Sequence, residues 1–535
     1  MTRDSKPGRE SGKSGKATTG FSSCFLVLIA GLPILEKMWA EEGQSRPETS
    51  RIFGEAWREP DGINRQFLPW LSGNADRIGT GLHNLERGLE RSSNIRRWVR
   101  SKVRAVLADW MEAGNERVVL RQGALVFRED LDYVAGPGFL DPSHLRNRRL
   151  ERAQSGEAVA FPDPRPAIRR FWKDCREAGV RLVVAPLPSR AMLGDGARDK
   201  VWNNRDFLKF RQELEAWGVS FFFPFDEIPD SPKPWFLTAD THWTPGLMDW
   251  YAQKLAAFLD TERLDGEHLF RFERPVTVSN RGDLAAMLGL APNSGIFGEQ
   301  SVMLRPVVNA RGGPWRASPD SGILILGDSF ANIFSDETMG WGKGAGLAPH
   351  LALRLNQALD VVAVNGSAAT RTREILAKRD HPLAGKRLVL WLFAARDLAF
   401  GNWRPFGLND HPDGWDDRKD QATKPQTDEI RLLARLETLP RVIDPSGTPY
   451  AQAVINLKFA VVEVLDGAYS QNEILARFQV IRDRRLTQAA MLVPGRNYEL
   501  ILTREIPEQS RGWTLIDDTE AYHLDECWVL HFQER

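Results

Sequence analysis

The chain has 535 residues, with 71 Lys plus Arg and 71 Asp plus Glu, so its formal net charge is zero. This length allows two to four domains and at least one large core. Without a basic excess, nothing points to a nucleic-acid partner. The three cysteines, Cys24, Cys175 and Cys527, have no spacing typical of a zinc site. Cys175 and Cys527 are either a disulfide or two buried thiols.

Residues 1–40 are predicted to be a basic segment followed by a signal anchor. MTRDSKPGRESGKSGK has five basic and two acidic residues, and GFSSCFLVLIAGLPIL follows it. The apolar run is in the signal-peptide range and short for a membrane helix. No small-residue cleavage site follows, so an uncleaved anchor is the first interpretation. A cleaved signal and a buried helix are the alternatives. The positive flank predicts that the rest of the chain lies outside the cytoplasm.

Residues 41–115 are predicted to be a helical lead-in, because apolar residues recur at helical spacing within NIRRWVRSKVRAVLADWMEAG. From residue 116 the pattern changes to continuous apolar runs that alternate with amphipathic helices. Thr244 and Pro245 are predicted to begin one of these helices, as N-cap and first residue. Such alternation favours an α/β fold, with a parallel sheet covered by helices on both faces.

The C-terminal quarter has a different pattern. Residues 404–428 are rich in Pro, Gly, Asn and Asp and are predicted to be a linker. Residues 429–535 alternate short β-like runs with turns, which predicts a small all-β domain, either a sandwich or a barrel. It is a possible carbohydrate-binding or interaction module.

Two short motifs carry candidate chemistry. ILILGDSF (323–330) places Ser329 directly after a buried strand, and FLTADTHWTPG contains Asp240 and His242 two residues apart. In an extended segment these two side chains point to the same side. Asp240 would then orient the imidazole of His242, which would activate Ser329 as a nucleophile. In the alternative interpretation, Ser329 and Asp240 are turn residues and His242 packs against Trp243.

The two motifs resemble those of the periplasmic alginate O-acetyltransferases, which have an SGNH-hydrolase-like domain. DTHWTPG precedes ILILGDSFANIF, which is the permuted order of that family. The resemblance covers about residues 116–403 and extends to four further segments: RVVLRQGALVF, RLVVAPLPSR, VVAVNGSA and LVLWLFAARDL. It implies an SGNH-like catalytic domain over residues 116–403.

Residue by residue, the resemblance implies Ser329 as nucleophile, His242 as base and Asp240 as orienting acid. The oxyanion donors would be the Ser329 backbone N–H together with Asn365 or the Gly366 N–H. Asp328 would shape the turn.

Three residues are candidates for binding substrate: Arg396, Trp243 and Arg190. Arg396 is as well explained by a structural salt bridge. No metal or cofactor is expected.

The expected function is O-acetyl transfer, through an acyl-Ser329 intermediate, to hydroxyls of an extracellular, alginate-like polysaccharide. A membrane acyltransferase partner is expected to supply the acetyl group. The protein is expected to be periplasmic and anchored to the inner membrane. The alternatives are an acetylesterase of the same fold, a non-catalytic polysaccharide-binding scaffold, and a metal site formed by Asp240, His242 and Asp328.

Overall fold

The computed structural model describes the chain from residue 115 onward, with gaps. The described ranges are 115–154 (without 116 and 122), 160–194, 201–229, 234–259, 265–289, 297–366, 369–410, 429–439, 452–505 and 524–535, with the short pieces 445, 507, 510 and 513–515. The predicted signal anchor, almost all of the predicted helical lead-in and residues 411–428 lie outside the described residues. Within the described ranges, no helix has both the length and the apolar content that a membrane span requires.

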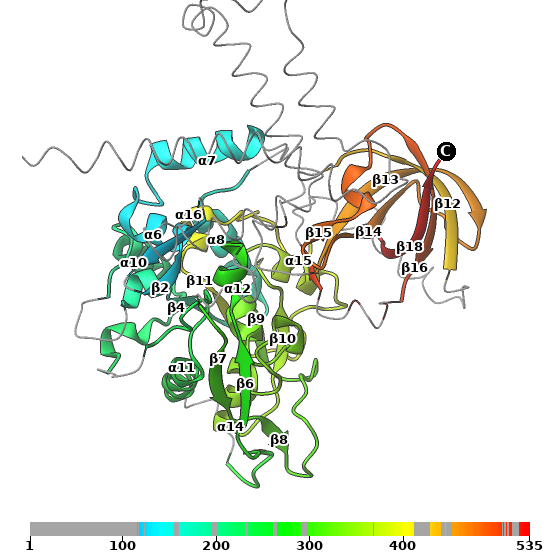
Figure 1. Cartoon of the computed structure of the whole chain (residues 1–535). Coiled ribbons are helices and arrows are strands. Elements are labelled where there is room, and N and C mark those ends of the chain that lie inside the picture. The colour runs from blue at the N-terminus through cyan, green and yellow to red at the C-terminus, as the bar shows by residue number, and fades with distance from the viewer. Residues whose placement is uncertain are drawn as a thin grey trace, which may run out of the picture. The chain divides into compact units, whose positions relative to one another are not determined.

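A five-stranded sheet lies at the centre of the first half of the described chain (Figure 1). Its strand order is β10-β9-β11-β3-β4, and all neighbouring pairs are parallel. The strands are β3 (Arg181–Leu187), β4 (Ser220–Phe221), β9 (Ile323–Gly327), β10 (Asp360–Ala363) and β11 (Leu388–Ala394). Every residue of β9 and β11 is buried, as expected for strands that are covered on both faces. The predicted α/β class is confirmed.

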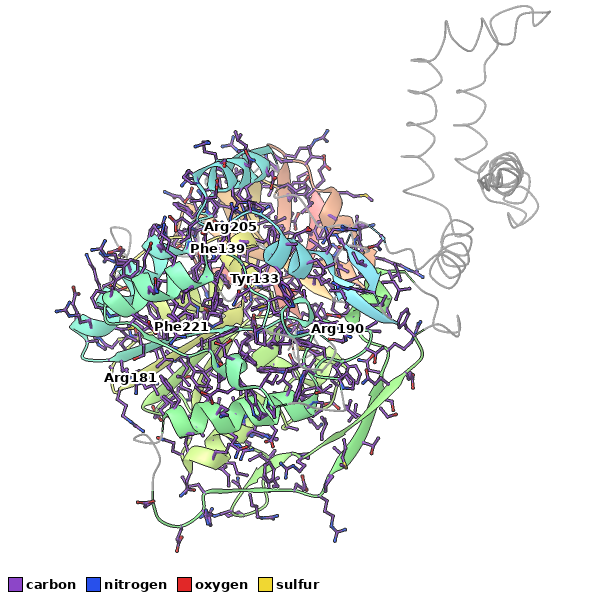
Figure 2. The ribbon with its side chains drawn as sticks, turned by 90° about the vertical axis from the view of Figure 1, so that its left-hand side faces the viewer. Tyr133, Phe139, Arg181, Arg190, Arg205 and Phe221 are labelled. Atoms are coloured by element: carbon purple, nitrogen blue, oxygen red, sulfur yellow. The ribbon has the colours of Figure 1, made fainter. Side chains whose placement is uncertain are left out.

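Successive residues of these strands pack into two separate cores. Leu182 and Val184 of β3 belong to one core, and Val183 and Ala185 belong to the other. The first core is covered by α6 (Arg128–Ala135), α8 (Pro164–Glu177), α10 (Phe207–Ala216) and α15 (Arg371–Ala377). The second is covered by α11 (Pro245–Phe258) and α14 (Leu347–Leu355). Figure 2 labels three aromatic residues of the first core: Tyr133, Phe139 and Phe221.

The helix that follows the DTHW motif begins where the sequence predicts. Thr244 has extended backbone angles, its side chain accepts a hydrogen bond from the Leu247 amide, and Pro245 is the first residue of α11. The cap satisfies one of the amides that a helix start leaves without a partner. This fixed helix start holds the preceding motif in place.

Short elements surround the sheet. β1 (Val118–Arg121) and β2 (Ala124–Phe127) form an antiparallel hairpin, and Leu125 donates a hydrogen bond to the Thr238 carbonyl. Two further antiparallel pairs are β5 (Phe270–Phe272) with β8 (Val307–Asn309), and β6 (Val276–Asn280) with β7 (Gln300–Leu304). The remaining helices are α7 (Pro142–Gln154), α9 (Arg190–Leu193), η1 (Pro224–Glu227), α12 (Asp283–Met287), α13 (Ser329–Asn332), η3 (Glu337–Met339) and α16 (Asp397–Phe400).

The C-terminal region is all-β, as predicted, and forms a closed barrel. β14 pairs with β18, β18 with β16, β16 with β12, and β12 with β13, and a β13–β14 pairing closes the ring. Closure removes the exposed edges of the sheet. The elements are β12 (Glu429–Leu436), β13 (Ala453–Asp466), β14 (Glu473–Arg482), β15 (Arg485–Leu486), η5 (Gln488–Met491), β16 (Asn497–Thr503), β17 (Thr514–Leu515) and β18 (Glu526–Glu534).

Residues 404–408 lie against the α/β core, although the sequence pattern places them in a linker. Phe406 and Leu408 are buried, and Arg373 donates to the Arg404 carbonyl at 2.7 Å. Cys175 and Cys527 are both buried and free, so the thiol interpretation fits the structure.

Candidate active site

Four of the candidate residues follow four adjacent parallel strands. Asn365 follows β10, Ser329 follows β9, Arg396 follows β11 and Arg190 follows β3, in the order of the strands across the sheet. The carboxyl ends of parallel strands lie along one edge, which is where open α/β sheets bind their ligands. The fold therefore gathers these residues at one edge of the sheet.

Ser329 is the first residue of α13, and Asp328 fixes the turn that leads into it. The carboxylate of Asp328 accepts hydrogen bonds from the backbone amides of Phe330 (2.9 Å) and Ala394 (2.8 Å), the last residue of β11. Burial raises the pKa of Asp328, and the charge of Arg396 opposes that rise. Asp328 thus has the turn-forming role that was predicted for it.

Gly327 is required where β9 turns into α13. A Cβ at this position would lie 2.7 Å from the Cβ of Ala331. The absence of a side chain at Gly327 allows α13 to begin two residues after the end of β9. Ser329, the first residue of this helix, is only 4% exposed.

Asp240 and His242 form a close pair. Nδ1 of His242 lies 2.6 Å from Oδ1 of Asp240, which also accepts a hydrogen bond from the His242 backbone amide at 3.0 Å. The segment is a turn rather than the extended strand that the sequence suggested: the Asp240 amide donates to the Leu237 carbonyl. The two side chains meet because an Asp side chain readily bonds the amide two residues on.

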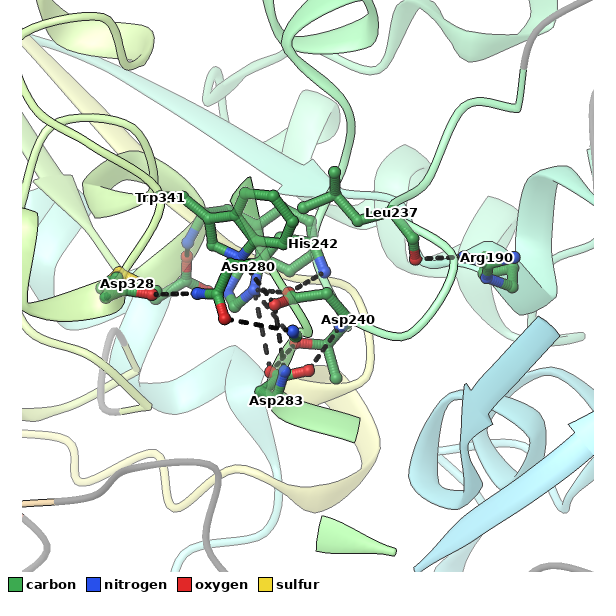
Figure 3. A network of polar contacts seen from close by, with 12 residues as sticks. Arg190, Leu237, Asp240, His242, Asn280, Asp283, Asp328 and Trp341 are labelled. Atoms are coloured by element: carbon green, nitrogen blue, oxygen red, sulfur yellow. Dashed lines mark hydrogen bonds and ion pairs between the residues drawn. The ribbon is translucent and has the colours of Figure 1, made fainter. Parts of the chain in front are cut away.

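The other oxygen of Asp240 is held by two remote groups. The indole Nε1 of Trp341 donates to Oδ2 at 2.9 Å, and the Asp283 amide donates to it at 3.1 Å (Figure 3). Burial alone raises the pKa of Asp240, but the hydrogen bond and charge of His242 and the bond from Trp341 lower it overall. Burial lowers the pKa of His242, and Asp240 raises it above its ordinary value.

The second nitrogen of the His242 imidazole is not used in a hydrogen bond within the described part of the chain. Nε2 of His242 is buried and has no hydrogen-bond partner within the described part of the chain. The ring centroid lies 4.9 Å from that of Phe330, the neighbour of Ser329. No hydrogen bond joins Ser329 to His242 among the described residues, so the structure contains the Asp240–His242 pair and a nearby Ser329, but not a completed triad.

Asn365 is oriented by a residue of α13. Nδ2 of Asn332 donates to Oδ1 of Asn365 at 2.8 Å, which leaves the Asn365 amide nitrogen as that side chain's donor. Gly366 follows with a φ of 74°, a conformation that favours glycine. Asn332, which the sequence analysis did not name, thus positions one of the three oxyanion candidates.

The three substrate-binding candidates are all engaged within the protein. Nη1 of Arg396 donates to Oδ1 of buried Asp130 on α6 at 3.0 Å, so this arginine forms a structural ion pair. Arg190 is buried and donates to the Leu237 carbonyl, three residues before Asp240 (Figure 3). Trp243 is fully buried against Phe330, with ring centroids 5.4 Å apart. These internal contacts hold the three side chains in place, and their role in substrate binding stays a prediction.

Asp283 is the main residue that the sequence analysis missed. It lies 43 residues after Asp240, and its carboxylate accepts hydrogen bonds from the amide (2.8 Å) and hydroxyl (2.5 Å) of Thr241. The Gly-Asp pair at 282–283 is a signal for a turn or helix start and gives no indication of its partner. Only the fold brings Asp283 to the motif.

The side chains of Asp240, His242 and Asp283 have metal-ligand atoms within 4.8 Å of one another. This group differs from the predicted metal alternative, because the Asp328 carboxylate is bound to two backbone amides. Both oxygens of Asp240 are also occupied by protein donors. The arrangement is therefore that of an oriented imidazole, held by internal hydrogen bonds.

Residues 146–395 match the sequence model of the SGNH hydrolase-like domain of acetyltransferase AlgX. This range contains both motifs and the whole parallel sheet. Residues 146–395 thus form a domain similar to the SGNH hydrolase-like domain of AlgX, referred to below as the AlgX-type domain. The predicted family resemblance is thus confirmed.

Solved structures with a similar chain course include three proteins of low sequence identity. They are the O-acetyltransferase domain of Pseudomonas putida AlgJ (18% identity, TM-score 0.40, 57% of this chain and 99% of that chain), Pseudomonas aeruginosa AlgX (15%, 0.34, 64% and 71%) and Bacillus cereus PatB1 (11%, 0.28, 53% and 97%). At these TM-scores the alignments fix neither activity nor substrate. The comparison with curated proteins gives no match.

The AlgX-type domain includes Asp240, His242, Asp283, Ser329 and Asn365, whereas Asp130 precedes it and Arg396 follows it by one residue. The family match supports acetyl transfer as the general activity of this domain.

Proposed function

We propose that the protein is a polysaccharide O-acetyltransferase that works through an acetyl-Ser329 intermediate. Two observations support this function: the match to an acetyltransferase domain and the open Nε2 of an imidazole that Asp240 holds from behind. The second carries the proposal, because a buried, unpartnered nitrogen on a ring that packs against Phe330, the residue after Ser329, is available to accept a proton.

In the first half-reaction, Oγ of Ser329 attacks the carbonyl carbon of the acetyl donor, and its proton passes to Nε2 of His242. The charge that develops on the carbonyl oxygen needs donors aimed at it. The Ser329 amide and the Asn365 side chain, or the Gly366 amide, are proposed for this role. The proton then passes from His242 to the departing group, and acetyl-Ser329 remains.

In the second half-reaction, a sugar hydroxyl gives its proton to His242 and attacks the acetyl-Ser329 carbonyl. The ester bond to the sugar forms, the bond to Ser329 breaks, and the proton returns from His242 to Oγ. Both steps need Oγ or the attacking oxygen within about 2.6–3.2 Å of Nε2. We propose that donor binding brings Ser329 to this distance.

The test is to incubate the protein with an activated acetyl ester, with and without an oligosaccharide, and to search for acetyl groups by mass spectrometry. Acetyl on Ser329, and transfer from it to the sugar, is the expected result. A Ser329→Ala variant is expected to give neither product.

The outcome separates the proposal from its rivals. Hydrolysis of the ester that the sugar does not change would favour an acetylesterase. Absence of label on Ser329 would favour a polysaccharide-binding scaffold. Activity that survives Ser329→Ala but is lost with a chelator would favour the metal alternative.

We further propose that the acceptor is an extracellular, alginate-like polymer and that a membrane acyltransferase delivers the acetyl group. We also propose that residues 1–40 hold the protein at the periplasmic face of the inner membrane. Deletion of residues 1–40 in an exported fusion should release the protein from the membrane fraction. Retention of the shortened protein in that fraction would contradict this anchor.

A further inference from the structure

A second acid lies behind the imidazole of His242, on a segment remote from the DTHW motif. Asp283 begins α12, and the turn before it fits closely against the motif. Gly282 has a φ of 90°, and a Cβ there would lie 2.2 Å from the Ala239 carbonyl oxygen. The amides of Leu284 and Ala285 both donate to this oxygen, at 3.0 and 3.2 Å. The two segments are therefore joined through their backbones.

The Asp283 carboxylate accepts two hydrogen bonds from Thr241, the residue between Asp240 and His242. Oδ1 accepts from the Thr241 amide at 2.8 Å, and Oδ2 accepts from the Thr241 hydroxyl at 2.5 Å. That hydroxyl oxygen lies 3.1 Å from Nδ1 of His242, and Oδ2 of Asp283 lies 3.8 Å from the same nitrogen. Nδ1 thus faces Asp240 directly and Asp283 through the Thr241 hydroxyl. Figure 3 shows Asp240 and Asp283 near His242.

We propose that Asp283 is a positioning residue of this site, which acts through Thr241 to fix the imidazole of His242 and adds a second negative charge behind it. This inference rests on the proposed function for its effect on the rate. Its effect on His242 itself can be measured without any reaction. Asp283 does not touch the reacting atoms.

The charges around Asp283 determine whether it raises or lowers the pKa of His242. Burial and the neighbouring Asp240 raise the pKa of Asp283 to about 6, while His242 opposes the rise. Burial lowers the pKa of Arg484, in the turn between β14 and β15, and the negative charge of Asp283 opposes that shift. The positive charge of Arg396 opposes the rise in the pKa of His242. In its ionised form Asp283 favours the protonated imidazole and so raises the pKa of His242.

The test is Asp283→Asn, which keeps an oxygen for the Thr241 amide and removes the charge. We expect the pKa of His242 to fall by about 0.5–1 unit, and the acidic limb of the pH–rate profile to move to lower pH by the same amount. Selective ¹³C labelling of histidine and NMR titration of the full chain measures the first shift, and loss of the signal in His242→Gln assigns it.

A matched control is Asp336→Asn. Asp336 accepts the same pair of hydrogen bonds, from the amide (3.0 Å) and hydroxyl (2.7 Å) of Thr338, at an exposed turn. We expect no shift of the His242 signal in this variant. Thr241→Val should disturb the His242 signal, and Thr241→Ser should restore it, because only the serine keeps the hydroxyl.

The possible results are distinct. An Asp283→Asn variant that is folded and leaves the His242 titration unchanged would overturn the inference. If instead the pKa of His242 falls but wild-type protein never forms acetyl-Ser329, the inference stands and the proposed function fails.

Discussion

At the scale of single residues, the site depends on how Asp240 distributes its hydrogen bonds. Oδ1 accepts from the side chain and the amide of His242, and Oδ2 accepts from Trp341 and the Asp283 amide. A carboxylate held at both oxygens cannot turn away from the ring. It therefore holds the tautomer with the proton on Nδ1, which leaves Nε2 able to accept a proton.

Asp240→Asn tests this role. We expect acetyl transfer to fall by about 10²–10⁴-fold, because the amide no longer stabilises the imidazolium and can favour the wrong tautomer. Steady-state kinetics with an acetyl ester and an oligosaccharide measures the loss.

Asp141→Asn is the matched control for this variant, since Asp141 also accepts the amide two residues on, at 2.8 Å, but at an exposed site. Its activity should match the wild type. An Asp240→Asn variant that keeps more than about a tenth of the wild-type rate would contradict the role of Asp240 as the orienting acid.

At the scale of elements, the site is assembled where the turn before α12 packs against the motif that precedes α11. The close approach requires Gly282, because a side chain there would collide with the Ala239 carbonyl. The positive φ of Gly282 adds a second reason, since residues with a Cβ rarely adopt it. The position of Asp283 thus depends on a glycine one residue away.

Gly282→Ala is expected to lower the free energy of unfolding by about 2–3 kcal/mol and to reduce activity, because the collision moves Asp283 away from Thr241. Urea denaturation and the acetyl-transfer assay measure the two effects.

Gly123→Ala is a control that separates the cost of a positive φ from the cost of the contact with the Ala239 carbonyl. Gly123 has a similar φ of 79°, but a Cβ there meets nothing within 4 Å. Its cost should be about 1 kcal/mol, from backbone strain alone, with activity unchanged. If Gly282→Ala and Gly123→Ala lower the free energy of unfolding equally, the contact with Ala239 does not add to the cost of the substitution.

At the scale of the whole molecule, one half-buried carboxylate links strand β18 of the barrel to helix α15. Glu526, at the start of β18, accepts from Arg371 of α15 (2.7 Å), from Lys378, which follows that helix, and from Arg477 of β14. The charges of these three partners hold the pKa of Glu526 well below its usual value, although burial opposes them. Removing one member of a buried charged group leaves the others without compensation.

Glu526→Gln is therefore expected to destabilise the protein by about 3 kcal/mol. Thermal unfolding should show a lower transition temperature, or two separate transitions in place of one. Glu534→Gln is the control on the same strand, because the Glu534–Arg496 pair is exposed and should contribute little. Equal effects of the two substitutions would refute a special role for Glu526.

The sequence by itself determined the features that depend on neighbours along the chain. The buried strand before Ser329, the start of α11 at Thr244 and Pro245, and the contact between Asp240 and His242 all follow from residues a few positions apart. Their geometry is limited by the local backbone, so a pattern of residue types is enough to predict them. The alternation of apolar runs with amphipathic helices predicted the parallel sheet, and the family resemblance added the SGNH-like domain and the permuted order of the two motifs.

The tertiary structure alone decided which remote groups complete the site. Three hydrogen bonds at the site join residues that are far apart in the sequence. The separations are 42 residues for Asp283 and Thr241, 101 for Trp341 and Asp240, and 266 for Asp130 and Arg396. These partners are chosen by the packing of segments against each other, and nothing in the local sequence of one segment specifies the other. For that reason the sequence left Arg396 open between substrate binding and a salt bridge, and the second acid behind His242 could not be foreseen.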